Sequence, residues 1–521
     1  MMKLNIKDTF NKELPADPNK NNTPRKVFEA CYSFVTPRIP SNPKMIHIAG
    51  EVAEVLDLER DTHSEEFLHT FSGKTVYPKT NPYAMCYGGH QFGHWAGQLG
   101  DGRAINLGEI RSNGQQWALQ LKGAGATPYS RTADGFAVLR SSIREHLCSE
   151  AMHYLGVPTT RSLSLALTGD EVLRDMLYDG NQAYEKGAVV CRVAPSFVRF
   201  GNFQILAARK DHKNLKNLAD YTIRNFHKDI QSEGKEKYIA FFQKIVNASL
   251  EMVLHWQRIG FVHGVMNTDN MSILGLTIDY GPYGWLEGYD PNWTPNTTDS
   301  RNHRYAYGNQ PGITLWNLVQ LANALYPLIE DAKPLEDILE NYQKSFDLKY
   351  VEMMSKKIGL TEKNAEVEEL IEDLEKNLQL TETDMTIFFR ELPRIQKKNT
   401  AQEAFQKIHK SFYKPLELAG ATTDAWNVWF TKYIELLQKE EDRDETRKFK
   451  MYEVNPKFVL RNYMAQLAIN AADKGDYSVI EELYEVLKRP YNEQPEYEKW
   501  YAKRPEWARN KVGCSMLSCS S

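Results

Sequence analysis

Two short polar segments near the middle of the chain combine residue types that could hold a metal ion and accept a proton. The first is His263-Gly-Val-Met-Asn-Thr-Asp-Asn270 and the second is Asp279-Tyr-Gly281. Asn270 and Asp279 offer the hard oxygen ligands that Mg²⁺ prefers while it keeps waters and phosphate oxygens in its shell. Asp269 is the only carboxylate of the first segment, so it is the candidate general base.

The order of these segments is typical of protein kinases, in which a His-containing catalytic loop ends in Asn and a short hairpin leads to Asp-Phe-Gly. An apolar run over residues 273–278, which we expect to be a strand, separates the two segments here. A kinase has its catalytic Asp two residues after the loop His, where this chain has Val265. The alternative is that Asp269 and Asn270 only make a turn, but Asp279 after the expected strand favours a metal site.

A lysine and a glutamate that could orient phosphates lie upstream. The sequence Trp117-Ala-Leu-Gln-Leu-Lys122 alternates like a strand and places Lys122 on its polar face. Glu145 lies in a helical pattern over residues 136–155. A strand lysine and a helix glutamate form the ion pair of kinases. Two unrelated surface charges are the commoner explanation for such residues, but the order of all the motifs along the chain favours the pair.

Glycines and arginines in the same half of the chain could bind the phosphates. Gly100 and Gly102 would let backbone N–H groups approach a phosphate, and Arg103 adds positive charge. Arg192 and Arg199 lie on either side of an Ala-Pro-Ser turn and could clamp a triphosphate. Each pattern alone is weak, because glycine hairpins and surface arginines are common.

The segment His90-Gln-Phe-Gly-His94 has the histidine spacing of a zinc protease. That motif requires Glu in its second position and an unbroken helix. Gln91 and Gly93 supply neither, so we reject a metalloprotease.

Composition and charge exclude several classes of protein. The chain has 521 residues, of which 42% are hydrophobic, and single cores stop growing at roughly 250–300 residues, so two or three lobes are expected. The net charge of −4 and the lack of a long basic tract disfavour nucleic-acid binding. We find no signal segment and no membrane-spanning run, and we therefore expect a cytoplasmic protein with no membrane partner.

Strand patterns concentrate early in the chain and helical patterns late, which indicates an α+β class. Together with the motif order, this predicts a protein-kinase-like fold with a mixed N-terminal lobe, a helical C-terminal lobe and a C-terminal helical extension. We expect residues 1–200 to form the first lobe with an N-terminal extension and residues 201–350 to form the second, with the catalytic loop. Residues 351–521 would form the helical extension and its cysteine-containing tail.

Four long motifs resemble the selenoprotein O family: Tyr87–Arg103, Leu121–Arg131, His263–Met271 and Asp279–Pro282. Arg192–Ser196 and Asn455–Asn462 extend the resemblance over nearly the whole chain. The resemblance implies a pseudokinase fold that binds ATP in a flipped orientation. It also implies transfer of AMP from ATP to Ser, Thr or Tyr hydroxyls of protein substrates, with release of pyrophosphate.

The resemblance also implies a role for each matching residue. Asp269 would accept the proton, Asn270 and Asp279 would bind Mg²⁺ or Mn²⁺, and Glu145 would pair with Lys122. The residues implied to bind ATP are Gly100, Gly102, Arg103, Lys122, Asp134, Gly135, Arg192, Arg199 and Asp279. These roles are physically consistent, because the α-phosphate must be the electrophile and cations must neutralise the departing pyrophosphate.

The family often carries a selenocysteine or cysteine third from the end, and Cys519 matches this position. The resemblance implies a redox role in which an oxidised tail is tethered to another lobe. Residues 283–307 contain no cysteine that could serve as the partner, and Cys514 is the nearest thiol in the sequence. A tail thiol without any role is the alternative.

Two other functions compete with adenylyl transfer. An ordinary kinase that transfers the γ-phosphate is disfavoured by Val265 in place of the usual Asp. A catalytically inactive nucleotide-binding scaffold is disfavoured because the complete set of lysine, glutamate, aspartate and asparagine side chains is present.

Overall fold

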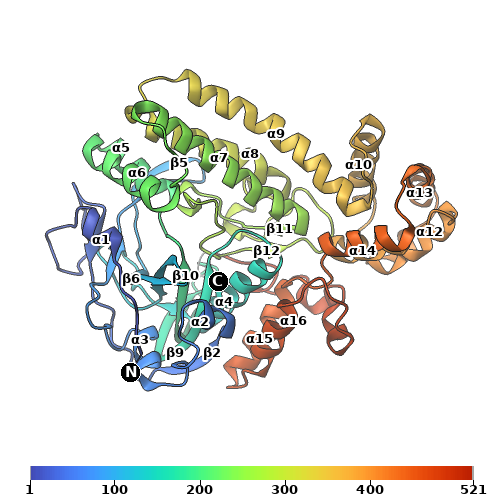
Figure 1. Ribbon diagram of the computed structural model, residues 1–521. Helices are drawn as coiled ribbons and strands as arrows, with labels where there is room; N and C mark the ends of the chain where they lie inside the picture. The colour runs from blue at the N-terminus through green and yellow to red at the C-terminus, as the bar shows by residue number, and fades with distance from the viewer. Residues whose placement is uncertain (1, 519–521) are drawn as a thin grey trace.

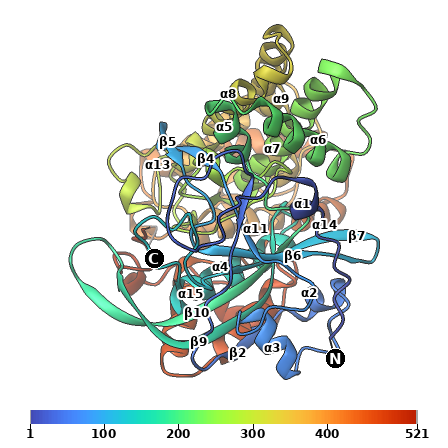
Figure 2. The same cartoon turned by 90° about the vertical axis from the view of Figure 1, so that its left-hand side faces the viewer.

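The computed structural model describes residues 2–518 and has an antiparallel sheet in its N-terminal part (Figure 1). The spatial order of the main strands is β1-β3-β6-β7-β10-β9-β2, and β8 (Ala137–Val138) pairs with β10. The strands of this path are β1 (Tyr32–Phe34), β2 (Lys44–Ile48), β3 (Tyr83–Met85), β6 (Ala104–Ser112), β7 (Gln115–Lys122), β9 (Arg161–Asp175) and β10 (Gln182–Ala194). A separate hairpin, β4 (Gly88–Gln91) and β5 (His94–Gln98), lies beside the helices (Figure 2).

The register of the central strands places three polar side chains on one face of the sheet. Gln120 of β7 lies opposite Arg192 of β10, and Lys122 lies opposite Val190. Because side chains alternate along a strand, Gln120, Lys122 and Arg192 share a face. Helix α4 (Leu139–Tyr154) packs against β9 and β10 and carries Glu145. The strand and helix predicted for this region are confirmed.

Helices make up most of the rest of the chain. Short helices α1 (Thr9–Glu13), α2 (Gly50–Val55) and α3 (Glu65–Phe71) accompany the sheet. The longer helices α5 (Phe200–Ala208), α6 (His212–Phe226), α7 (Gly234–Ile259), α8 (Gln310–Leu325) and α9 (Lys333–Ile358) lie together above it in Figure 1. Helix α7 ends before Gly260, whose φ of 72° is the left-handed conformation common at helix C-caps. The mixed α+β class is therefore confirmed.

The C-terminal third contributes to two hydrophobic cores. The second core is built mainly from α9 to α14 and includes Trp426 and Trp429. Residues of the segment that follows, from Phe458 to Cys514, are buried in the first core, which also contains Met2 and other residues of the N-terminal part. Helices α15 and α16 there pack against α4. The helices of this third are α10 (Ala365–Leu378), α11 (Met385–Glu391), α12 (Ala401–Lys407), α13 (Ala421–Lys439), α14 (Asp444–Val454), α15 (Asn462–Asp473) and α16 (Ser478–Leu487).

One local prediction is wrong. Residues 273–278 form a turn with isolated bridges instead of a strand, because Gly275 adopts a φ of 66° and Met271 bridges back to Thr277. Near the C-terminal end, Gly475, with a φ of 84°, separates α15 from α16. Within residues 2–518, no helix is both long enough and apolar enough to cross a bilayer.

Candidate active site

A cleft of about 650 Å³ lies between the sheet and the loop that follows α7. We call it the site cleft. Ten of the residues that the sequence predicts line it: Gly100, Gly102, Arg103, Lys122, Asp134, Gly135, Arg192, Asp269, Asn270 and Asp279. Glu145 and Arg199 do not line the cleft, but each contacts lining residues from behind. The structure thus brings together side chains from segments that are far apart in the sequence.

The loop before Asp279 is held by buried hydrogen bonds. His263 donates from Nε2 to the Ile278 carbonyl over 2.8 Å, and burial lowers the pKa of this histidine. Asn270 donates from Nδ2 to the Val265 carbonyl over 2.9 Å, so its side-chain oxygen is the atom left to face the cleft. Asp279 has a φ of 57°, a left-handed conformation that non-glycine residues rarely adopt and that is often found at functional sites.

Two arginines hold the Asp279 carboxylate. Arg192 donates to one of its oxygens and Arg199 to the other. Burial alone would raise the pKa of Asp279, but Arg199, Arg192 and Lys122 together hold it well below its usual value. Asp279 is therefore a carboxylate, and it presents negative charge at the base of the cleft.

Lys122 and Glu145 form the predicted ion pair. Their Nζ and Oε2 atoms are 2.7 Å apart, and both side chains are buried. The second glutamate oxygen accepts a hydrogen bond from Arg192 over 3.1 Å. Burial lowers the pKa of Lys122 to about 8, although Glu145 opposes this shift. One glutamate thus balances two buried cations that face the cleft.

We expect Glu145→Gln to reduce the free energy of unfolding by about 3 kcal/mol, because it removes the shared partner of two buried cations. The measurement is equilibrium unfolding in urea. Glu366→Gln is the matched control, because its pair with Lys439 is exposed on both sides and exposed pairs contribute little. Equal stability of the two variants would show that Glu145 does not balance the buried charges.

Asp269 is a buried carboxylate with spare hydrogen-bonding capacity. Among the described residues its Oδ1 has no hydrogen-bond partner, and its Oδ2 has only a long contact of 3.5 Å with Nε2 of Gln91. Burial raises its pKa to about 6, and Arg199 opposes that rise. Gly89 lies against it so closely that a Cβ atom at this position would come within 2.6 Å of Oδ1. This packing fixes the carboxylate in the cleft.

The sequence reasoning missed several residues around the site. Asp101 is buried, accepts a hydrogen bond from the Met85 N–H over 3.0 Å and lies 4.0 Å from Arg199. Tyr87 places its ring 4.7 Å from the Arg199 guanidinium. Both residues occur inside the glycine-rich segment, but nothing in their type or spacing separates them from their neighbours. Arg174 is also missed; it binds Asp134 at 2.7 Å.

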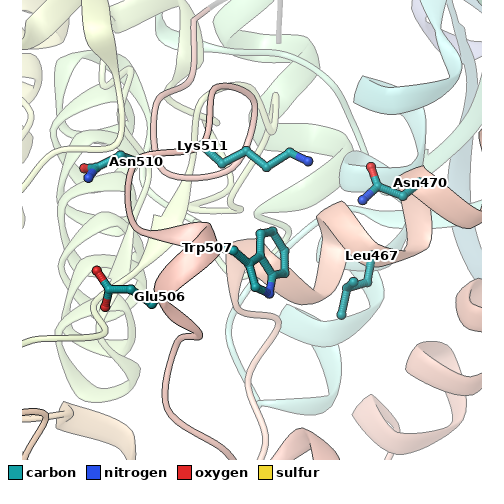
Figure 3. Close-up of a pocket in the computed structure, with 6 residues that line it drawn as sticks. All are labelled: Leu467, Asn470, Glu506, Trp507, Asn510 and Lys511. Carbon is teal, nitrogen blue, oxygen red and sulfur yellow. The ribbon is translucent and has the colours of Figure 1, made fainter.

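A second hollow, of about 550 Å³, lies where the C-terminal segment meets α15 (Figure 3). Trp507 points into it between Leu467 and Glu506. It shares no lining residue with the site cleft and contains none of the predicted site residues. Cys519, the residue predicted to have a redox role, lies outside the described residues.

The residues that line the site cleft lie within the part of the chain that matches one protein family. The family described as protein adenylyltransferase SelO matches residues 20–488, and the chain belongs to this family. The chain is 61% identical to the protein nucleotidyltransferase YdiU of Flavobacterium johnsoniae over the full length of both proteins. It is 52% identical to the protein of the same name from Rhodopirellula baltica, over 99% of both chains. The one from Aromatoleum aromaticum is 51% identical over the full length of both.

Proposed function

We propose that this chain is a protein adenylyltransferase that transfers AMP from ATP to hydroxyl groups of Ser, Thr or Tyr side chains in other proteins. Its family and the names of its relatives support this activity. The observation that carries the proposal is the position of Asp269. Asp269 lines the same cleft as Lys122 and Arg192, so a candidate base and phosphate-binding cations share one cleft.

The donor set at the base of the cleft fits a divalent cation. Asn270 offers an amide oxygen and Asp279 a carboxylate, and both line the cleft. Among residues 2–518 no group of three or more His, Cys, Asp or Glu side chains is arranged to enclose a metal. A site with two protein ligands, Asn270 and Asp279, suits Mg²⁺ or Mn²⁺, because these cations complete their coordination shells with water and phosphate oxygens. When bound, the cation would neutralise phosphate charge.

Different residues of the site cleft have different roles in the proposed reaction. Asp269 accepts the proton of the acceptor hydroxyl while the hydroxyl oxygen forms a bond to the α-phosphorus. The bond between that phosphorus and the oxygen that bridges it to the β-phosphate breaks, and pyrophosphate leaves. Lys122, Arg192 and Arg103 lie where positive charge can stabilise the departing pyrophosphate. Gly100 and Gly102 line the cleft, and a side chain at either position would collide with Tyr129. Asp134 and Gly135 complete the cleft wall.

We further propose that these parts form a protein-kinase-like fold in which ATP lies flipped, with its α-phosphate towards Asp269. The pairing of a strand lysine with a helix glutamate, and a loop that leads to Asp279, support this architecture. Within it, residues 1–200 and 201–350 would be the two lobes and residues 351–521 the helical extension.

Mass spectrometry of an acceptor protein incubated with the enzyme, ATP and Mg²⁺ tests the proposed activity. We expect acceptor peptides to gain an adenylyl group on a hydroxyl side chain. Peptides that gain only a phosphoryl group would identify an ordinary kinase, and unmodified peptides across a broad panel of acceptors would favour an inactive scaffold.

A further inference from the structure

The β4–β5 hairpin contacts the loop that carries the proposed base. The His90 N–H donates to Thr268 Oγ1 over 2.7 Å, and Gln91 reaches Asp269 itself. The N–H of the next residue, Phe92, donates to Asn267 Oδ1 over 3.1 Å. This hairpin contains the His90–His94 segment, which has no assigned role in the proposed reaction. Its first strand therefore runs along the loop that carries Asp269.

A surface groove of about 520 Å³ begins one residue further along the hairpin. We call it the acceptor groove. Its walls are Phe92 from the hairpin, Asn302 and Arg304 from the loop before α8, and Asn309 and Ile313 at the start of α8. Gln91 contacts Asp269 and Phe92 lines the groove. Phe92 is the turn residue directly after Gln91, so a chain lying in the groove would contact the same turn that touches the loop of the proposed base.

The charged side chain that lines the acceptor groove is positive. Among the described residues, Arg304 is the only charged side chain that lines it, and no carboxylate lies within salt-bridge distance of Arg304. The Arg304 guanidinium instead lies 4.8 Å from the Trp316 ring, and its Nε has no hydrogen-bond partner among the described residues. Arg301 and His303 next to it and His94 on the hairpin are exposed. Nearby Asp299 is buried and accepts the backbone N–H groups of Arg304 and Tyr305.

We propose that the acceptor groove binds the acceptor protein through an extended segment that carries acidic residues next to the modified hydroxyl. The inference rests on the proposed adenylyl transfer and adds to it the class of acceptor. The charge of Arg304 and its neighbours selects carboxylates. Gly312 of the groove leaves room for a peptide backbone, because a Cβ atom at this position would meet no atom within 4 Å.

Gly312 permits a test that leaves the fold intact. It is the third residue of α8 and is exposed. A longer side chain there gains helix propensity, and a glutamate is favoured in the first turn of a helix. Gly312→Glu therefore places a negative charge in the groove, and Gly312→Gln is a control of matched size. Arg304→Gln removes the positive charge from the opposite wall.

The experiment measures binding of fluorescent serine peptides by anisotropy, with flanking residues that are glutamate, glutamine or lysine. We expect the wild-type enzyme to bind the glutamate peptide at least about fivefold more tightly than the glutamine peptide, with a preference that falls as salt is added. Gly312→Glu and Arg304→Gln should lose that preference, whereas Gly312→Gln should keep it. Equal binding of the three peptides by the wild-type enzyme, or equal losses in the two Gly312 variants, would overturn the inference.

A parallel assay of AMP transfer to the same peptides separates the two proposals. Transfer without any preference for acidic peptides would leave the proposed function intact and refute the acidic acceptor. A charge preference in binding without transfer to any peptide would support the groove and count against adenylyl transfer. ATP binding by Gly312→Glu should equal that of the wild type, because Gly312 does not line the site cleft; weakened ATP binding would also count against a separate acceptor groove.

Discussion

Asp269→Asn should retain ATP binding but lose AMP transfer by at least about 10²-fold, which is the usual contribution of a general base. The substitution keeps the shape of the side chain and removes the group that accepts the hydroxyl proton. Asp269 Oδ1 has no partner among the described residues, so few structural contacts are lost with its charge. The measurements are the initial rate of label transfer from ATP and the affinity for ATP.

Two further variants make this prediction specific. Gly89→Ala keeps the aspartate at position 269 but puts a methyl group within 2.6 Å of its Oδ1, so the carboxylate must shift and transfer should also slow. Gly50→Ala, whose added Cβ meets nothing within 4 Å, is the control and should transfer AMP at the wild-type rate. A wild-type rate for Asp269→Asn would remove Asp269 from the role of base.

Asp279→Asn should reduce transfer by about 10²-fold to 10³-fold and raise the Mg²⁺ concentration needed for half-maximal rate. The variant removes the only carboxylate of the proposed metal site, and loss of a single preorganised charge-stabilising group commonly has an effect of this size. It also leaves Arg192 and Arg199 without the carboxylate that both contact. The measurement is the rate of transfer over a range of Mg²⁺ concentrations.

Asp347→Asn provides the control for this second prediction, because Asp347 is exposed on α9 and lies outside the site cleft. Circular dichroism and thermal unfolding should show that Asp279→Asn is folded before its rate is interpreted. An unchanged rate together with an unchanged dependence on Mg²⁺ would contradict the role of Asp279 as a metal ligand.

The parts of the site that the sequence predicts are those set by local pattern. The alternation before Lys122 identifies a strand, the periodicity around Glu145 identifies a helix, and their ion pair follows from the order of the motifs. The position of Gly260 at the end of α7 likewise needs only local backbone chemistry. Predictions of this kind succeed because the relevant free energies arise within a few residues.

The parts that escape prediction depend on contacts between distant segments. Gln91 and Asp269 are separated by 178 positions in the chain, and no periodicity links them. Arg199, which is predicted to bind phosphate, lies behind the cleft, and no pattern in the sequence marks its contact with Asp279, 80 positions away. The apolar run over residues 273–278 suggests a strand, yet Gly275 turns the chain so that Met271 bridges to Thr277, and only isolated bridges form.

Incubation of the enzyme and an acceptor protein with ATP labelled at either the α- or the γ-phosphate tests the central claim most directly. Adenylyl transfer predicts that only the α-label becomes attached to protein in the presence of Mg²⁺ or Mn²⁺, while the γ-label leaves with pyrophosphate. Attachment of the γ-label alone would contradict the account and would identify the cleft as that of an ordinary kinase.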